Sequence, residues 1–325
     1  MLNFLKSLLL VVGIMMPLFF SSCTATRLYW AARDGDTETV KLLVSQGADF
    51  RTQFPDSENR TSLHIAAYGG HTDIVRIFLQ NGADVNNQSR TTGRTALHEA
   101  AHSGHAEIAR LLISYGANVN IRDAYGETAL IQSAAYGYTD IVRQLIAANA
   151  NVNVKNVLGT TALNTAATNG RTDIVRMLIA AGANDLYALM FEAIENKRFT
   201  QVKTLLLAGA NVNYQNEKGQ SLLWWATYHN NVAAARLFIE SGADVNKRSR
   251  NGYNPLHVAA ECGYVDMLLL LLNSGAIVNV TSAWDSAGIK GWTALDLAKR
   301  DKKDACFRIL RQVGGLYMRE IRYPR

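Results

Sequence analysis

The sequence predicts an all-α solenoid built from about nine stacked helix-turn-helix repeats. A phrase of Thr, a small residue, Leu and paired alanines returns at a step of about 33 residues. A Gly-Ala doublet followed by Asn/Asp-Val-Asn returns at the same step, and the apolar residues between the two recur at helical spacing. A fixed period of this length indicates small modules that bury their apolar faces only against neighbouring modules.

Two sets of anchors divide the chain into the same units. The residues that open the phrase are Thr61, Thr95, Thr128, Thr161, Ser221, Asn254 and Thr293. The doublets begin at Gly47, Gly82, Gly116, Asn149, Gly182, Gly209, Gly242 and Gly275. Together they define about nine units between Arg27 and Arg322.

The residues of a single unit predict its two helices. Thr128 precedes an apolar run and suits a helix N-cap, where its hydroxyl satisfies a free backbone N–H. The small residues Ala134 and Ala135 let two helices approach closely, and Gly137 closes the first helix in a conformation that glycine adopts at little cost. A second helix should follow, with one buried face made by Ile141, Val142, Leu145 and Ile146.

The stretch "TALHEAAHSGHAEIARLLISYGANVN" from Thr95 to Asn120 closely resembles the ankyrin-repeat family. The resemblance covers nearly all of the chain after residue 26. It implies that short β-hairpin loops join the units. It also implies a non-catalytic scaffold that binds another protein through its concave surface.

The period is interrupted in two places. The step from Gly182 to Gly209 is only 27 residues, and Asn184 leads almost directly into the next helix. We therefore expect a change of curvature between residues 27–184, with repeats one to five, and residues 185–322, with repeats six to nine and a basic cap. Residues 281–292 are longer than the standard loop and should bulge outward, and residues 323–325 form a tail.

Residues 1–22 stand apart from the repeats and have the features of a signal peptide. Lys6 supplies a positive charge, and residues 8–20 form an apolar run of 13 residues, too short to span a bilayer comfortably. The sequence from Phe20 to Cys23 resembles a bacterial lipobox, although Phe20 stands where Leu is usual. We expect Cys23 to carry a lipid, with residues 23–26 as a short lipidated tether. An ordinary cleaved signal and an uncleaved anchor are the alternatives.

This segment also predicts where the protein lies. The mature chain should be exported and held at the cell envelope through the lipid on Cys23. Thr24 is not the Asp that resembles an inner-membrane retention signal. The outer membrane or the periplasmic side is therefore favoured for a Gram-negative bacterium.

The net charge of +6 is concentrated at the C-terminus, where nine basic and three acidic residues follow from Lys299 onward. We interpret this cluster as a soluble cap of the last repeat; a docking face for an acidic partner or anionic lipid is the alternative. Nucleic acid is not an expected partner, because an exported chain would not ordinarily meet it. Cys262 and Cys306 are not neighbours in the repeat pattern, so we expect two free thiols.

One motif suggests an enzyme. The run from His98 through Glu99 to His102 spells H-E-x-x-H, which binds zinc through two histidines and uses the Glu as a base. However, His98 occupies a repeat position that His64 and His257 also fill without that motif. A zinc site also needs a third ligand and a cleft. We interpret the match as coincidence, and no metal, cofactor, small-molecule substrate or catalytic set is expected.

The ankyrin resemblance places partner contacts at the loop tips and at the exposed ends of the first helices. Tyrosine is prominent there, and its large amphipathic ring suits binding; packing between neighbouring rings is the alternative. The residues are Tyr68, His102, Tyr125, Glu127, Tyr136, Leu158, Lys218, Tyr228, Arg250, Tyr253 and Glu261. We expect a monomer with one protein partner; a purely structural envelope spacer is the remaining alternative.

A second apolar surface is possible on the helix with the run Met267 to Leu272. Leu269 occupies the position that Arg76, Arg110, Arg143 and Arg176 fill in other units. Either the insertion with Trp284 and Trp292 covers this run, or the run forms an exposed patch for a partner or membrane.

Overall fold

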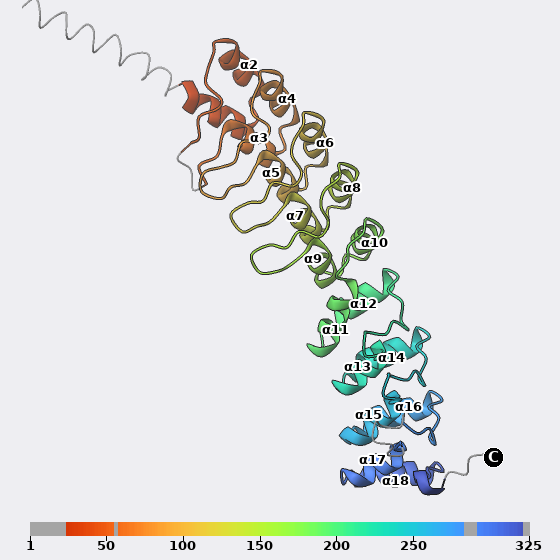
Figure 1. Cartoon of the computed structure of the whole chain (residues 1–325). Coiled ribbons are helices and arrows are strands. Elements are labelled where there is room, and N and C mark those ends of the chain that lie inside the picture. The colour runs from red at the N-terminus through yellow and green to blue at the C-terminus, as the bar shows by residue number, and fades with distance from the viewer. Residues whose placement is uncertain (1–23, 55–57, 283–290, 321–325) are drawn as a thin grey trace, which may run out of the picture. The chain divides into compact units, whose positions relative to one another are not determined.

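The computed structural model describes residues 24–54, 58–282 and 291–320. Over these ranges the chain is a series of paired helices joined by turns, which confirms the predicted all-helical solenoid (Figure 1). The described loops contain no strand, and the only β pairing in them is two isolated bridges, Gln215 with Ser221 and Thr281 with Thr293. The connections expected as β-hairpins are therefore turns held by other hydrogen bonds.

Each repeat contributes a first and a second helix, and in the first repeat the first helix includes residues 24–34. The first helices are α3 (Ser62–Gly69), α5 (Ala96–Ser103), α7 (Ala129–Tyr136), α9 (Ala162–Thr168), α11 (Leu186–Glu195), α13 (Leu222–Tyr228), α15 (Pro255–Cys262) and α17 (Ala294–Arg300). The second helices are α2 (Thr37–Ser45), α4 (Thr72–Gln80), α6 (Ala106–Ser114), α8 (Thr139–Ala147), α10 (Thr172–Ala180), α12 (Phe199–Leu207), α14 (Val232–Glu240), α16 (Val265–Asn273) and α18 (Asp304–Gln312). A 3₁₀ turn, η1 (Met318–Glu320), follows α18.

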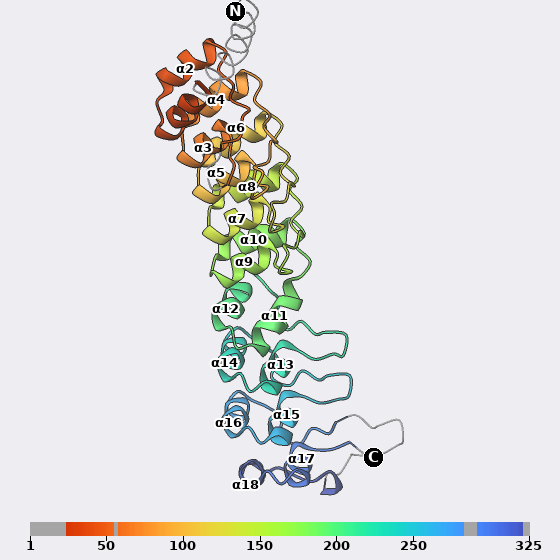
Figure 2. The ribbon, with the colours of Figure 1, turned by 90° about the vertical axis from the view of Figure 1, so that its left-hand side faces the viewer.

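The contacts divide the chain into two units, Met1–Asn184 and Asp185–Arg325. In unit 1, α3, α5, α7 and α9 contact one another in succession, and α4, α6, α8 and α10 form a second row beside them (Figure 1). In unit 2, α11, α13, α15 and α17 form one row and α12, α14, α16 and α18 the other. The long turns lie on the side of the first row, as Figure 1 shows for unit 1 and Figure 2 for unit 2.

The residues at the ends of the first helices explain where these helices begin and end. The Thr95 hydroxyl oxygen accepts from the backbone N–H of His98 at the start of α5, and Gly104 ends the helix in the left-handed region at φ 82°. Ala100 and Ala101 are fully buried, because larger side chains would separate neighbouring helices. The repeat phrase thus specifies the N-cap of the first helix, its close contact with neighbouring helices and its C-terminal end.

The second helices are amphipathic. In α6, Ile108, Ala109 and Leu112 are buried, whereas Glu107 and Arg110 form an ion pair three residues apart on the solvent side. The same exposed pairing recurs as Asp140–Arg143 and Asp173–Arg176. Such pairs contribute only a few tenths of a kcal/mol each, so burial of the apolar face holds these helices in place.

The second Asn of each Asn/Asp-Val-Asn phrase joins consecutive repeats. Oδ1 of Asn246 accepts from the backbone N–H of Ile277 at 2.8 Å, while its Nδ2 donates to the carbonyl oxygen of Gly275 at 3.2 Å. Within unit 1, Asn153 makes the equivalent bonds to Asn184 and Gly182. One amide therefore satisfies two backbone groups of the next turn, which explains why the phrase demands Asn.

The two irregular positions of the pattern have structural counterparts. Asn149, which replaces the doublet glycine, has φ 59°, in the left-handed region that Asn tolerates best after Gly. Only residues 181–185 separate α10 from α11, so the loop there is as short as the 27-residue step indicates. The boundary between the two units falls within this loop.

One expectation is corrected at the start of the described chain. Residues 24–34 are helical, and Ala25 and Leu28 are buried, so residues 24–26 are not an extended tether. Their apolar face packs in the first repeat instead. A helix rises about 1.5 Å per residue, so these three residues span about 4–5 Å rather than the 10 Å of an extended chain. Cys23 and residues 1–22 lie outside the described part. Within the described part, no helix has the length and apolar character to cross a membrane.

Candidate functional site

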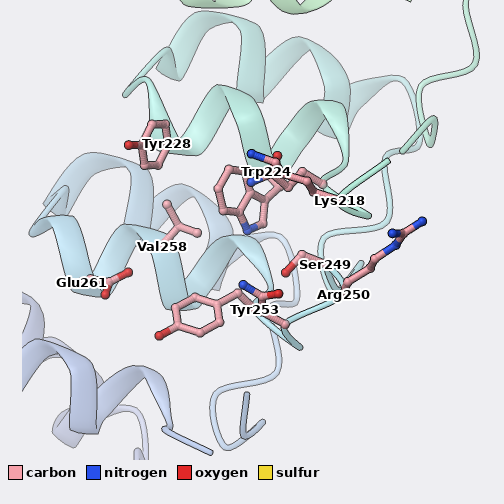
Figure 3. A pocket seen from close by; sticks show the side chains of 10 residues that line it. Lys218, Trp224, Tyr228, Ser249, Arg250, Tyr253, Val258 and Glu261 are labelled. Atoms are coloured by element: carbon pink, nitrogen blue, oxygen red, sulfur yellow. The ribbon is translucent and has the colours of Figure 1, made fainter. Parts of the chain in front are cut away.

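Unit 2 contains a cleft of about 400 Å³ between the turns and the first helices of two consecutive repeats. Figure 3 shows Trp224 and Tyr228 on α13 facing Val258 and Tyr253, with Glu261 at one end and Lys218 and Arg250 at the other. The remaining lining residues are Gln220, Ser249 and Asn251. The cleft therefore combines an aromatic wall with polar ends of different charge.

The aromatic wall of this cleft is held by further rings. Trp224 and Tyr228 stack almost in parallel, with ring centroids 5.4 Å apart and planes at 10°. Trp225 lies behind them and contacts Phe191 at 5.5 Å in an edge-to-face arrangement. The Nε1 atoms of both tryptophans are buried without a hydrogen-bond acceptor. The packing behind the wall orders its rings before any ligand arrives, which lowers the entropy cost of binding.

The end of the cleft near Glu261 is electrically neutralised. A carboxylate oxygen of Glu261 lies 2.6 Å from the Arg300 guanidinium, which also pairs with Asp301 at 2.7 Å. Partial burial and the negative charge of Glu261 raise the pKa of Tyr253, so its phenol stays protonated and can donate a hydrogen bond. Glu261 is therefore a paired group, unlike the cations at the opposite end.

Unit 1 contains a second cleft, of about 370 Å³, in the corresponding place between turns and first helices. Its rim carries Tyr125 and Tyr136, both exposed. Its polar residues are mostly acidic, with Glu58, Asp123 and Glu127 against Arg94. Thr92, His102, Gln132 and Ala135 complete the lining. This cleft resembles the one in unit 2 in place and size and differs from it in charge.

A row of rings borders the unit 1 cleft. His102 lies 6.4 Å from Tyr68 and 4.9 Å from Tyr136, measured between ring centroids. Tyr136 in turn lies 5.9 Å from Tyr138, and the Arg60 guanidinium lies 5.4 Å from the centre of the Tyr68 ring. Burial lowers the pKa of His102, which keeps this ring neutral near pH 7. The row presents flat apolar faces with polar edges.

The structure brings most of the predicted contact residues together in these two clefts. His102, Tyr125, Glu127 and Tyr136 line the cleft of unit 1, and Lys218, Tyr228, Arg250, Tyr253 and Glu261 line that of unit 2. Tyr68 lies next to His102 in the row of rings. Leu158 lines neither cleft and is 83% exposed at a turn tip.

Several lining residues were not anticipated from the sequence. Trp224 is the clearest, because it stands three residues after Ser221, where His98 stands three residues after Thr95. An indole at a position that usually holds a buried imidazole was a usable indication. Arg94 and Asp123 gave no comparable indication, because turn residues of either charge are common in this pattern.

The geometry around His98 does not fit a zinc ligand. Nδ1 of His98 accepts the backbone N–H of Thr95 at 3.1 Å, so Nε2 carries the proton and donates to the carbonyl oxygen of Glu127 at 3.2 Å. Both ring nitrogens are thus occupied by protein, and Glu99 is fully buried 3.5 Å from Arg94. No group of three or more candidate metal ligands occurs among the described residues. The H-E-x-x-H run thus combines His98, the buried histidine of the repeat phrase, with His102, which lines the cleft of unit 1.

Other predicted features have mixed outcomes. Leu269 is 40% exposed, so part of the apolar run on α16 reaches the surface; Trp284 lies outside the described residues.

Cys262 and Cys306 are free thiols, and burial raises the pKa of both. At the C-terminus, three cations surround the ring of Tyr317 at 4.8–5.3 Å: Lys299, Arg311 and Arg319.

Comparison with known proteins agrees with the repeat pattern. A family model described as ankyrin repeats (3 copies) matches residues 6–89, 28–123, 121–186 and 189–282. These matches span most of the chain, and successive matches meet near residue 186, where the short loop lies. The comparison with curated proteins finds no match for the chain.

Proposed function

The chain belongs to the ankyrin-repeat family, and on this premise we propose that it is a lipid-anchored, non-catalytic scaffold that binds another protein through its two clefts. Ankyrin repeats are generally scaffolds for protein–protein interaction. The observation that carries the proposal is the convergence of nine predicted contact residues, four in one cleft and five in the other. Exposed tyrosines on a rigid helical frame are typical of interface hot spots.

The binding surface is tested by affinity capture from membranes of the source cell. The variant carries Tyr136→Ala, Tyr228→Ala and Tyr253→Ala, which removes rings from both clefts. Tyr115→Ala is the matched control, because Tyr115 is an exposed tyrosine at the end of α6 that lines neither cleft. The native chain and the control should recover one dominant partner, and the triple variant should lose it while keeping its helical circular dichroism. Recovery that is equal for all three proteins would contradict the proposed surface.

We propose further that the mature protein begins at a lipidated Cys23 and lies at the outer membrane or on its periplasmic side. The support is the signal-like segment and its lipobox resemblance. Because residues 24–34 are already helical, few residues separate Cys23 from the first repeat, which would therefore lie close to the bilayer surface. Mass spectrometry of the mature N-terminus tests this: a diacylated Cys23 supports it, whereas an unmodified Met1 or an unlipidated processed terminus would refute it.

Two other functions make different predictions. A structural spacer would keep its phenotype when Tyr136, Tyr228 and Tyr253 are replaced, because spacing depends on the stack and not on these rings. A zinc hydrolase would purify with stoichiometric zinc that is lost in His102→Ala. For the scaffold we expect no zinc above background in either protein, measured by inductively coupled plasma mass spectrometry.

A further inference from the structure

We infer that the cleft of unit 2 binds an extended, acidic segment of the partner. This inference rests on the proposed protein-binding function and adds the charge and conformation of the ligand at one cleft. The decisive residues are the cations Lys218 and Arg250, together with the ring wall formed by Trp224, Tyr228 and Tyr253.

The positive charge at the end of the cleft formed by Lys218 and Arg250 is not neutralised by an ion pair among the described residues. Lys218 and Arg250 lie on consecutive turns, joined by the backbone N–H of Arg250, which donates to the carbonyl oxygen of Lys218 at 3.0 Å. Both side chains are exposed, and neither has an ion-pair partner among the described residues. Glu217, the nearest acidic residue in sequence, does not line the cleft. The two cations are therefore free to pair with a ligand.

The acidic residue of the cleft does not cancel this charge. Glu261 pairs with Arg300 at 2.6 Å, at the end opposite Lys218 and Arg250 (Figure 3). A ligand along the cleft would meet neutralised charge at one end and net positive charge at the other. A segment with carboxylates at one end fits this gradient, and a basic segment would be repelled.

The shape of the wall favours an extended backbone. Trp224 and Tyr228 form a flat, stacked surface, and grooves lined by aromatic rings bind extended peptide segments, as in the recognition of polyproline-type helices. Gln220, Ser249, Asn251 and the phenol of Tyr253 supply hydrogen-bonding groups for a peptide backbone. A single-stranded nucleic acid also stacks on rings, but its affinity depends on many phosphate contacts. Two free cations at one end of the cleft, with a carboxylate at the other, are a poor substitute for these.

The cleft of unit 1 serves as an internal comparison. Its acidic residues Glu58, Asp123 and Glu127 outnumber Arg94, which itself lies 3.5 Å from Glu99. Two clefts of similar size on one chain thus differ in sign, so a charge preference that follows only the cations of unit 2 belongs to that cleft.

The experiment uses the full chain as bait for a displayed library of random twelve-residue peptides. Peptides enriched on the native chain should be net acidic. An enriched peptide should lose about tenfold or more in affinity, measured by fluorescence anisotropy, for Lys218→Glu/Arg250→Glu. Lys218→Gln/Arg250→Gln should give a smaller loss and guards against misfolding of the reversed variant. Lys203→Glu/Arg236→Glu, at two exposed cations on α12 and α14 that line neither cleft, should leave the affinity unchanged.

Several outcomes would overturn the inference. These are enrichment of neutral or basic peptides, no enrichment, an affinity indifferent to Lys218 and Arg250, and tighter binding of a single-stranded DNA twelve-mer than of the acidic peptide. If the native chain still captures a protein partner in these cases, the scaffold function stands and only the inference about the acidic segment fails. Loss of partner capture by the native chain itself would instead refute the scaffold function.

Discussion

Nε2 of His98 lies 3.2 Å from the carbonyl oxygen of Glu127, so the first helix of one repeat is bonded to the turn that opens the next. Two other repeats form the same bond at 3.0 Å: His64 to Arg94 and His257 to Trp292. Burial is the main cause that lowers the pKa of all three imidazoles to about 4. These histidines are therefore neutral structural links.

Because these three histidines are buried in the neutral form, we expect the folded protein to lose stability when the pH falls below about 6.5. Between pH 6.5 and 4 the unfolded chain binds protons at these histidines while the folded chain does not. The free energy of unfolding is therefore complete above pH 6.5 and falls as the pH drops toward 4, by up to about 3 kcal/mol per histidine. Urea denaturation followed by circular dichroism across this range measures the effect.

His98→Ile provides the matched variant, because Ile131 fills this position in the next repeat. The variant should keep the fold and lose about one third of the pH dependence. An unchanged slope between pH 6.5 and 4 would show that His98 does not contribute.

Substitutions at Gly116 test whether the second helix α6 must end in a residue with left-handed backbone conformation. Its φ is 85°, and an added Cβ would meet no atom within 4 Å, so only backbone strain opposes a side chain there. Gly116→Ala should cost about 1–2 kcal/mol in the free energy of unfolding. Gly116→Asn should cost clearly less, because Asn149 adopts φ 59° at the equivalent position. Equal losses for the two variants would contradict this explanation.

Asn246 tests the amide link between repeats. Asn246→Ala removes the bonds to Ile277 and Gly275 and should lower the free energy of unfolding by about 1–3 kcal/mol, since both backbone groups lose their partner. Asn246→Asp keeps the acceptor and should give an intermediate loss. Asn273→Ala, at an exposed position of α16, is the control and should change stability by less than about 0.5 kcal/mol.

Leu269 tests whether the apolar surface of α16 is needed for folding. Leu269→Arg should be neutral or slightly stabilising, because Asp266 lies three residues before it and restores the pair seen at Glu107 and Arg110. Binding of a hydrophobic dye should decrease. Leu268→Arg, at a fully buried neighbour, should unfold the repeat. A large loss of stability in Leu269→Arg would instead show that this side chain packs against the protein.

The repeat pattern predicted the helices, their caps and nine of the twenty residues that line the two clefts, because each of these depends on side chains within one period. Thr95 capping α5 and the exposed ends at Tyr136 and Tyr228 are local consequences of the pattern. Trp224 was missed because its position holds a buried histidine in other repeats, and only the structure shows that the indole is partly exposed and lines the cleft. The helical conformation of residues 24–26, which were expected to form a tether, was missed because the apolar face that Ala25 shares with Leu28 is too short to recognise without its packing partners.

The sequence by itself determined the fold class, the repeat boundaries and the break near residue 184, since a solenoid is set by contacts between adjacent modules. Only the tertiary structure decided which side chains share a cleft and which charges remain free there. Glu261 and Arg300 are 39 residues apart and pair across two repeats, whereas Lys218 and Arg250 remain without an ion-pair partner among the described residues. The reason is physical: a period fixes where a side chain lies in its own repeat, but its electrostatic partner depends on the neighbouring repeat that packs against it.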